Sequence, residues 1–208
     1  MVGSPRIAGL RVVDGRPILL FDEEVPSVPT VVIDDLLEHR RRLGLDKKDE
    51  RWAGEWRIVN PPEVWHIRVQ RDLLVALIPR AAALGIEPLG ESGVFGAPDD
   101  WRVPDLVFVR PEDIDGDDEG WVRAELVVEI RSPGDDSYRK LPFYAERVRE
   151  VLVLHRDRTP ELYRGMDRVA VEADGSVRSE ALGVTFTPVG TDDGPRLRIT
   201  WDGGAAAV

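Results

Sequence analysis

Two apolar stretches that each carry an acid decide the fold of this chain: residues 102–110, RVPDLVFVR, and residues 122–144, VRAELVVEIRSPGDDSYRKLPFY. The first reads as a strand with Asp105 near its start. The second opens with a strand at 126–130, with Glu129 near its end. The almost unbroken apolar character of 126–130 indicates burial on both faces. Charges are costly in such strands, so each carboxylate needs a partner, a metal ion or a proton.

The positions of the two acids predict that they meet. If their strands are neighbours and antiparallel, the start of one lies beside the end of the other, which brings Asp105 and Glu129 to one edge of the sheet. Alternate residues of a strand share a face, so Glu129 points the same way as Glu125, Val127 and Arg131. The residues between them point into the opposite layer.

Two carboxylates a few ångströms apart cannot both stay ionised without a cation between them. Oxygen ligands of this kind suit Mg²⁺ or Mn²⁺, which can activate a water and stabilise charge on a phosphodiester oxygen. Lys140 supplies a further cation nearby, and the helix that follows it favours a phosphate at its N-terminus. An equally weighted alternative is structural, with Asp105 and Glu129 paired to Arg131, Lys140 or Arg102.

The N-terminal part of the chain alternates strand and helix patterns. Residues 6–21 read as two strands around Asp14-Gly15, residues 31–45 as an amphipathic helix, and residues 51–59 as a strand. Residues 60–63, NPPE, predict the start of a helix that runs to about Leu84. Pro79 is expected to kink this helix or end it early, and Gly85 to stop it.

The remaining pattern predicts one mixed sheet. Residues 86–95 and 103–110 form a strand pair, and a short helix begins at Pro142 between the strands at 126–130 and 151–155, which are therefore parallel. Residues 161–164 and 169–173 read as outer strands. The fold class is α+β or α/β, a mostly antiparallel sheet flanked by helices. We expect an N-terminal hairpin extension over 1–30, a main domain over 31–200 and a disordered tail over 201–208.

Composition narrows the class of protein. A chain of 208 residues suits one sizeable core, and its net charge of −11 disfavours non-specific coating of nucleic acid, although an enzyme with a metal and a local basic rim stays compatible. The absence of cysteine excludes disulfides, a thiolate nucleophile and a zinc–thiolate site. No apolar run approaches the ~20 residues of a membrane span, and the N-terminus lacks a secretory pattern, so a cytoplasmic protein without membrane contact is expected.

Several motifs occur in a recognisable order between about residues 30 and 165. They are Gly54-Glu55, His66, Pro104-Asp105, Glu129, Ser132-Pro133, Asp136, Lys140 and Tyr144. This order resembles the Uma-two family, whose members are predicted to be restriction endonucleases within the PD-(D/E)XK nuclease superfamily. The resemblance implies a restriction-endonuclease-like mixed sheet flanked by helices. It also implies an endonuclease that hydrolyses DNA with Mg²⁺ or Mn²⁺.

The resemblance assigns roles to the central residues. Asp105 and Glu129 are implied metal ligands, helped by the main-chain carbonyl of Ile130. The superfamily's usual lysine, two residues after the glutamate, is replaced here by Arg131, so Lys140 takes that role by resemblance. A guanidinium does not release its proton, so Arg131 cannot act as that lysine, but it can bind a phosphate.

Other residues have supporting roles that stay open. Glu55 is either a ligand of a second metal or a surface acid, and His66 either faces the site or serves packing. Asp136 and Tyr144 lie four residues on either side of Lys140, a spacing that would place them on its side of a helix to position it.

Two functions follow from these residues. The first is a DNA endonuclease with an Asp-Glu-Lys site, for which a homodimer is one expectation because enzymes that cut both strands often dimerise. The second is a non-catalytic module that binds nucleic acid or protein and retains the nuclease fold.

Overall fold

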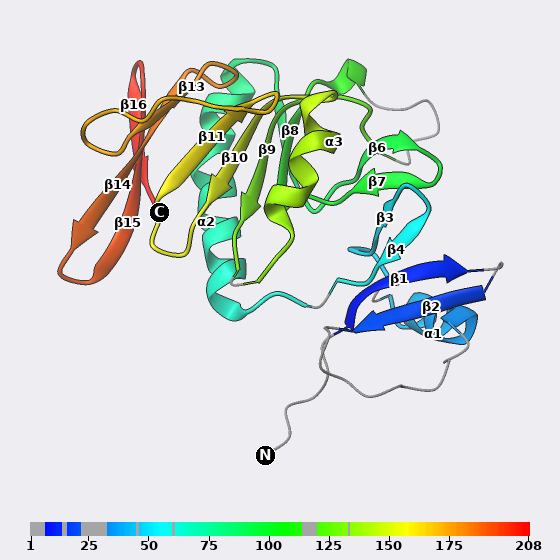
Figure 1. Cartoon of the computed structure of the whole chain (residues 1–208). Coiled ribbons are helices and arrows are strands. Elements are labelled where there is room, and N and C mark those ends of the chain that lie inside the picture. Colours follow the sequence, from blue (N-terminus) through cyan, green and yellow to red (C-terminus); the bar gives the residue numbers. More distant parts are fainter. Residues whose placement is uncertain are drawn as a thin grey trace. The chain divides into compact units, whose positions relative to one another are not determined.

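The structure, a computed structural model, describes residues 7–13, 16–21, 33–44, 46–59, 61–113, 120–132 and 134–208, with side chains from residue 37 onward. The chain divides into two compact units (Figure 1). The smaller comprises Met1–Pro61 and Gly96–Val103, and the larger comprises Pro62–Phe95 and Pro104–Val208. The sequence analysis placed domain limits after residues 30 and 200. The two units do not divide the chain at those positions, and those limits stay predictions.

The smaller unit contains β1 (Ile7–Val13), β2 (Arg16–Phe21), α1 (Ile33–Arg42), β3 (Glu50–Trp52), β4 (Glu55–Arg57) and β7 (Asp100–Arg102). The antiparallel pairing of β1 with β2 confirms the predicted strand pair, whose Asp14-Gly15 turn lies outside the described residues. The single strand predicted over 51–59 is wrong, because β3 and β4 form an antiparallel hairpin. Ala53 and Gly54 both have positive φ, 47° and 88°, and reverse the chain between them.

A six-stranded sheet in the order β12-β11-β10-β9-β8-β5 organises the larger unit. Its strands are β5 (Glu87–Gly90), β8 (Leu106–Val109), β9 (Ala124–Ile130), β10 (Val148–Leu154), β11 (Pro160–Arg164) and β12 (Asp167–Arg168). The pair β9 and β10 is parallel and every other pair of neighbours is antiparallel. The mixed sheet and the parallel crossover are therefore confirmed.

Two of the strand predictions are wrong. Residues 86–95 form β5 and then β6 (Val94–Ala97), which leads from the larger unit into the smaller, so the predicted continuous strand is wrong. The outer strand predicted at 169–173 is also wrong, because the short β12 precedes it. A one-turn 3₁₀ helix, η1 (Pro111–Asp113), follows β8.

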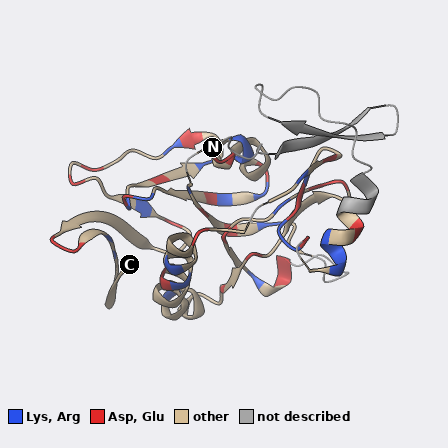
Figure 2. Ribbon diagram, turned by 90° about the horizontal axis from the view of Figure 1, so that it is seen from below, with Lys and Arg blue, Asp and Glu red and all other residues tan. Residues whose placement is uncertain are grey.

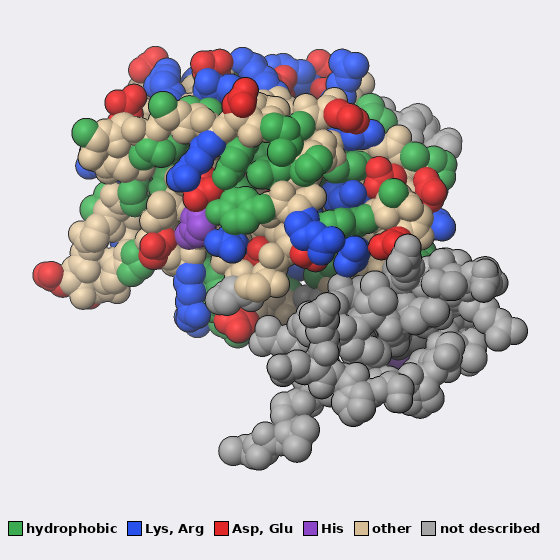
Figure 3. Space-filling model, viewed as in Figure 1, with side chains coloured by type: hydrophobic (Ala, Val, Ile, Leu, Met, Phe, Trp, Pro, Cys, Tyr) green, Lys and Arg blue, Asp and Glu red, His purple; other side chains and the backbone are tan. Residues whose placement is uncertain are grey.

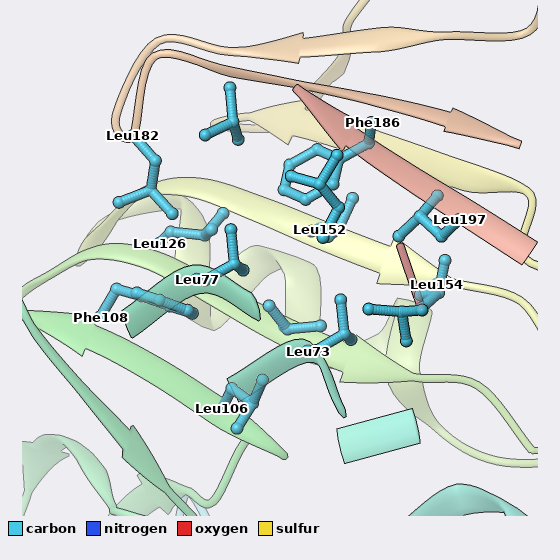
Figure 4. Close-up of a cluster of buried hydrophobic side chains, with 14 of the residues drawn as sticks. Leu73, Leu77, Leu106, Phe108, Leu126, Leu152, Leu154, Leu182, Phe186 and Leu197 are labelled. Atoms are coloured by element: carbon cyan, nitrogen blue, oxygen red, sulfur yellow. The ribbon is translucent and has the colours of Figure 1, made fainter. Parts of the chain in front are cut away.

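Helices cover both faces of the six-stranded sheet (Figure 1). One face packs against α2 (Val64–Ala83), and Figure 4 shows Leu73 and Leu77 of this helix against side chains of β8, β9 and β10. The other face packs against η2 (Ser137–Lys140) and α3 (Leu141–Ala145). Residues 126, 128 and 130 belong to the first layer and Val127 to the second, which confirms the predicted alternation along β9.

Helix α2 ends where the sequence predicts but differs from the prediction at Pro79. Its N-cap is Glu63, which makes no side-chain capping bond. Pro79 does not end the helix, which continues to Ala83 because Leu77 and Ala81 on either side are fully buried. Gly85, at φ 67°, provides the predicted stop. Among the described helices, none has both the length and the apolar character of a membrane span.

The C-terminal residues form a second sheet of the larger unit, in the order β13-β14-β15-β16. Its strands are β13 (Val177–Ser179), β14 (Val184–Thr191), β15 (Gly194–Trp201) and β16 (Gly204–Ala207). The tail expected to fray over 201–208 instead pairs with β15. Val208 is 4% exposed and exchanges two backbone hydrogen bonds with Leu197, of 2.6 and 2.9 Å, which explains its order.

Candidate functional site

The two acids of the predicted site lie at one edge of the six-stranded sheet. Strands β8 and β9 are antiparallel neighbours in which Leu106 pairs with Val128. Continuing this register by one residue places Asp105, just before β8, opposite Glu129 near the end of β9. The antiparallel arrangement predicted from the sequence is thus confirmed for these strands.

Glu129 is buried, with 4% of its surface exposed, and holds two partners from the segment that follows β9. The Lys140 ammonium donates to both of its carboxylate oxygens, at 3.1 and 3.2 Å. The Tyr144 hydroxyl donates to Oε1 at 2.6 Å. Pro142 suits the first turn of α3, and this helix packs the fully buried Tyr144 against the sheet. The Lys140 ammonium and the Tyr144 hydroxyl therefore both compensate the buried carboxylate.

Asp105 is held by a different set of groups. Its Oδ1 lies 2.9 Å from Nε2 of His66, and its Oδ2 accepts the backbone N–H of Ile130 at 2.6 Å. The Gln70 amide donates to its main-chain carbonyl at 2.8 Å. His66 is 7% exposed, and its Nδ1 lies 3.5 Å from the Ser132 hydroxyl. Helix α2 thus contributes two side chains, one turn apart, that fix the residue before β8.

Gln70 is a site neighbour that the sequence reasoning missed. A signal existed, because His66 and Gln70 are separated by four residues and so share one face of a helix. Both are polar and buried, which in a helix that packs on a sheet indicates a specific hydrogen-bonding task.

The other predicted residues lie in different surroundings. Arg131 stacks over the Tyr138 ring, with 4.6 Å from its guanidinium carbon to the ring centroid. The Asp136 carboxylate accepts a 3.1 Å hydrogen bond from the exposed Arg139. Glu55 belongs to β4 of the smaller unit, where it forms a 3.5 Å ion pair with Arg57.

The donor chemistry of Asp105 and Glu129 fits Mg²⁺ or Mn²⁺, since both ions prefer oxygen and accept one or two carboxylates while keeping waters. Within the described ranges, no group of three or more His, Asp or Glu side chains is arranged to hold a metal ion. An ion here would be held by these two carboxylates, the main-chain carbonyl of Ile130 and bound waters.

A second polar cluster, absent from the sequence prediction, surrounds Glu161 at the start of β11. Its carboxylate accepts hydrogen bonds from the hydroxyls of Tyr138 and Tyr163 at 3.0 and 2.8 Å, and pairs with His155 and Arg168 at 3.1 and 3.2 Å. Burial opposes its charge, but the hydrogen bonds and Arg168 outweigh burial and lower the pKa of Glu161. Burial, with the bond to Glu161, raises the pKa of Tyr163 to about 12.

Comparison with known proteins places these features in context. The model of the Uma2 family, described as "Putative restriction endonuclease", matches residues 34–187. A solved structure of "a putative nuclease belonging to DUF820" from Anabaena variabilis ATCC 29413 is similar in fold, with a TM-score of 0.55 and 15% sequence identity over 64% of this chain and 82% of that one. A comparison with curated proteins found no match.

Proposed function

Because the chain belongs to the Uma2 family of restriction-endonuclease type, we propose that it is a metal-dependent endonuclease that hydrolyses phosphodiester bonds in DNA. The family and the nuclease-like fold support a hydrolase that acts on nucleic acid. One observation carries the finer proposal: Lys140 and Glu129 form a buried pair, 3.1 Å apart, on the strand edge where Asp105 lies in the opposing register.

In this proposal Asp105 and Glu129 hold Mg²⁺ or Mn²⁺, with help from the main-chain carbonyl of Ile130. Such an ion, when bound, supplies a more acidic water and stabilises negative charge on phosphate oxygens. Lys140 places a positive charge where the phosphorane-like transition state becomes more negative.

Two neighbours act through these ligands. His66 fixes the Asp105 carboxylate through the 2.9 Å contact, and Tyr144 fixes the Glu129 carboxylate through the 2.6 Å hydrogen bond. Partners of this kind orient metal-binding carboxylates and hold them ready for the ion.

The decisive test is cleavage of plasmid and single-stranded DNA with Mg²⁺ or Mn²⁺. Lys140→Ala should lower the rate by roughly 100-fold, the usual cost of removing one group that stabilises transition-state charge. Arg123→Ala is the matched control, because Arg123 is exposed and precedes β9 at the strand's other end. Calorimetric titration of the metal should give binding heat with the wild type and little with Glu129→Gln. A wild type with neither cleavage nor metal binding would exclude the enzyme.

A non-catalytic module that binds nucleic acid or protein is the second candidate. It is favoured by the observation that Lys140 already occupies both oxygens of Glu129, the arrangement of a purely structural ion pair. DNA binding without cleavage under any metal would identify it. A cytoplasmic location and a homodimer are further proposals, and light scattering in solution tests the latter.

A further inference from the structure

Two arginines follow the carboxyl ends of the two parallel strands. Strands β9 and β10 pair so that Ile130 and Leu154, their last residues, are partners. Arg131 comes directly after β9, and Arg156 is the second residue after β10. In open parallel sheets, ligands bind at the carboxyl ends of the strands, where loops carry side chains out of the sheet.

Each arginine rests on an aromatic ring. Arg131 lies 4.6 Å from the centroid of Tyr138, and Arg156 lies 5.1 Å from the centroid of Trp65. Stacking restrains the planar guanidinium and leaves its edge available for a bidentate acceptor such as a phosphate.

The two rings are themselves fixed through their polar atoms. The Tyr138 hydroxyl donates to Glu161 at 3.0 Å, and the Trp65 indole N–H donates to Glu63 at 2.5 Å. Trp65 also packs against the main hydrophobic core. Both arginines therefore stack on anchored supports, which lowers the entropy that a ligand must overcome to order them.

Sequence neighbours of the two arginines and of their ring supports contact the proposed catalytic site. Arg131 precedes Ser132, whose hydroxyl lies 3.5 Å from Nδ1 of His66. The other ring nitrogen of His66 contacts Asp105 at 2.9 Å. His66 in turn follows Trp65, the support of Arg156.

Within the described residues, neither arginine donates a hydrogen bond to a carboxylate. Nε of Arg131 forms only a loose ion pair with the Asp135 carboxylate, at 3.8 Å, which is beyond hydrogen-bonding distance, and a third of the arginine side chain is exposed. Arg156 is exposed and makes no ion pair within the described part of the chain. Its neighbour Asp157 accepts the backbone N–H of Thr159 instead.

These local positive charges matter because the whole chain is acidic. Figure 2 shows basic and acidic residues interspersed along the ribbon, and on the face drawn in Figure 3 Lys and Arg side chains lie among hydrophobic side chains and a histidine. With a net charge of −11, a polyanion cannot be attracted by the overall field and requires specific cationic contacts.

We propose that Arg131 and Arg156, stacked on Tyr138 and Trp65, form a clamp for backbone phosphates of DNA beside Asp105. The clamp rests on the proposed function for the identity of its ligand. Its contribution is to binding and is independent of the metal. Because phosphates carry no base identity, the clamp positions the strand without reading its sequence.

The test measures binding in EDTA, where metal-dependent cleavage cannot occur. Fluorescence anisotropy of one labelled oligonucleotide, single-stranded and as a duplex, gives Kd as a function of salt concentration for the wild type and for Arg131→Ala, Arg156→Ala and Arg156→Lys. Arg123→Ala again provides the control with the same loss of charge, and thermal unfolding of each variant verifies that it is folded.

Each of Arg131→Ala and Arg156→Ala should flatten the slope of log Kd against log salt by about 0.7 for the single strand or about 0.9 for the duplex, the value of one phosphate contact. Affinity at low salt should weaken about fivefold, as expected for one partly exposed ionic contact. Arg156→Lys, which keeps the charge but loses the planar fork, should retain the slope and bind more weakly. Arg123→Ala should match the wild type.

The clamp is overturned if the wild type does not bind DNA in EDTA, if both alanine variants keep the wild-type slope, or if Arg123→Ala flattens it equally. Failure of the proposed function gives a different result: the salt slopes change as expected, yet no DNA is cut with Mg²⁺ or Mn²⁺.

Discussion

The buried pair of Glu129 and Lys140 makes a quantitative prediction about stability that does not depend on activity. Lys140→Met removes the ammonium and leaves a carboxylate whose side chain is 6% exposed with Tyr144 as its remaining donor among these partners. Breaking a buried ion pair from one side costs about 3–5 kcal/mol. The retained tyrosine hydrogen bond and the 12% exposure of Lys140 favour the lower end, about 3 kcal/mol. For a chain of this length that loss lowers Tm by about 6–12 °C.

A double variant at Glu129 and Lys140 shows whether the lost stability comes from an uncompensated charge or from lost packing. Glu129→Leu combined with Lys140→Met removes both charges, so we expect it to regain most of the loss and to differ from the wild type by about 1 kcal/mol, the hydrogen bond that Tyr144 no longer makes. Urea unfolding at neutral pH measures all four corners of this cycle. A coupling energy of about 2 kcal/mol or more is expected for groups in direct contact.

An exposed ion pair of the same sheet provides the control. Arg149 is 52% exposed and pairs with Glu125 at 3.3 Å, so Arg149→Met should cost under about 1 kcal/mol. The reasoning is refuted if Lys140→Met costs no more than this control, or if the double variant is as unstable as the sum of the single ones.

Three further outcomes are expected. Glu150→Gln should destabilise the protein by about 3 kcal/mol in urea unfolding. Both oxygens of this fully buried carboxylate accept hydrogen bonds, one of them from Arg164 at 2.8 Å, and the amide nitrogen of glutamine would face these donors with a donor of its own. Stability should fall as pH rises from about 10 to about 12, since folded Tyr163 keeps a proton that the unfolded chain loses; Tyr163→Phe should reduce this fall, and ultraviolet titration of the tyrosines should show one that ionises near the upper limit. Gly85→Ala should lower stability by about 1 kcal/mol in thermal unfolding, because φ is 67° although space for a methyl group exists. A wild-type Tm in that variant would contradict the requirement for glycine.

The register that brings Asp105 opposite Glu129 in the candidate site was predictable because strand patterns are local. The apolar run of β9 and the acid before β8 are visible in the sequence, and the antiparallel neighbours place Asp105 opposite Glu129. Burial on both faces of β9 follows from the same run, since Val127 and Val128 are fully buried in different layers.

Predictions that rested on the local preference of single residues or short segments were less successful. Pro79 stays inside α2 because the helix packs on both sides of it, and the final residues pair with β15 although their composition is that of a loose tail. Ala53 turns the hairpin of β3 and β4 with a positive φ that its residue type does not favour. In each case long-range packing or pairing outweighs a local preference.

By itself the sequence determined the acids, their strands, the lysine beyond them and the family to which the chain belongs. Only the tertiary structure decided their partners. It joins Glu129 to Lys140 and Tyr144 on one face of the sheet, and Asp105 to His66 and Gln70 of α2. It also places Arg156 on Trp65, which precedes it by about ninety residues in the chain. The physical reason is that strand polarity and apolar periodicity are encoded locally, whereas a side chain's partner depends on elements that meet only when the core closes.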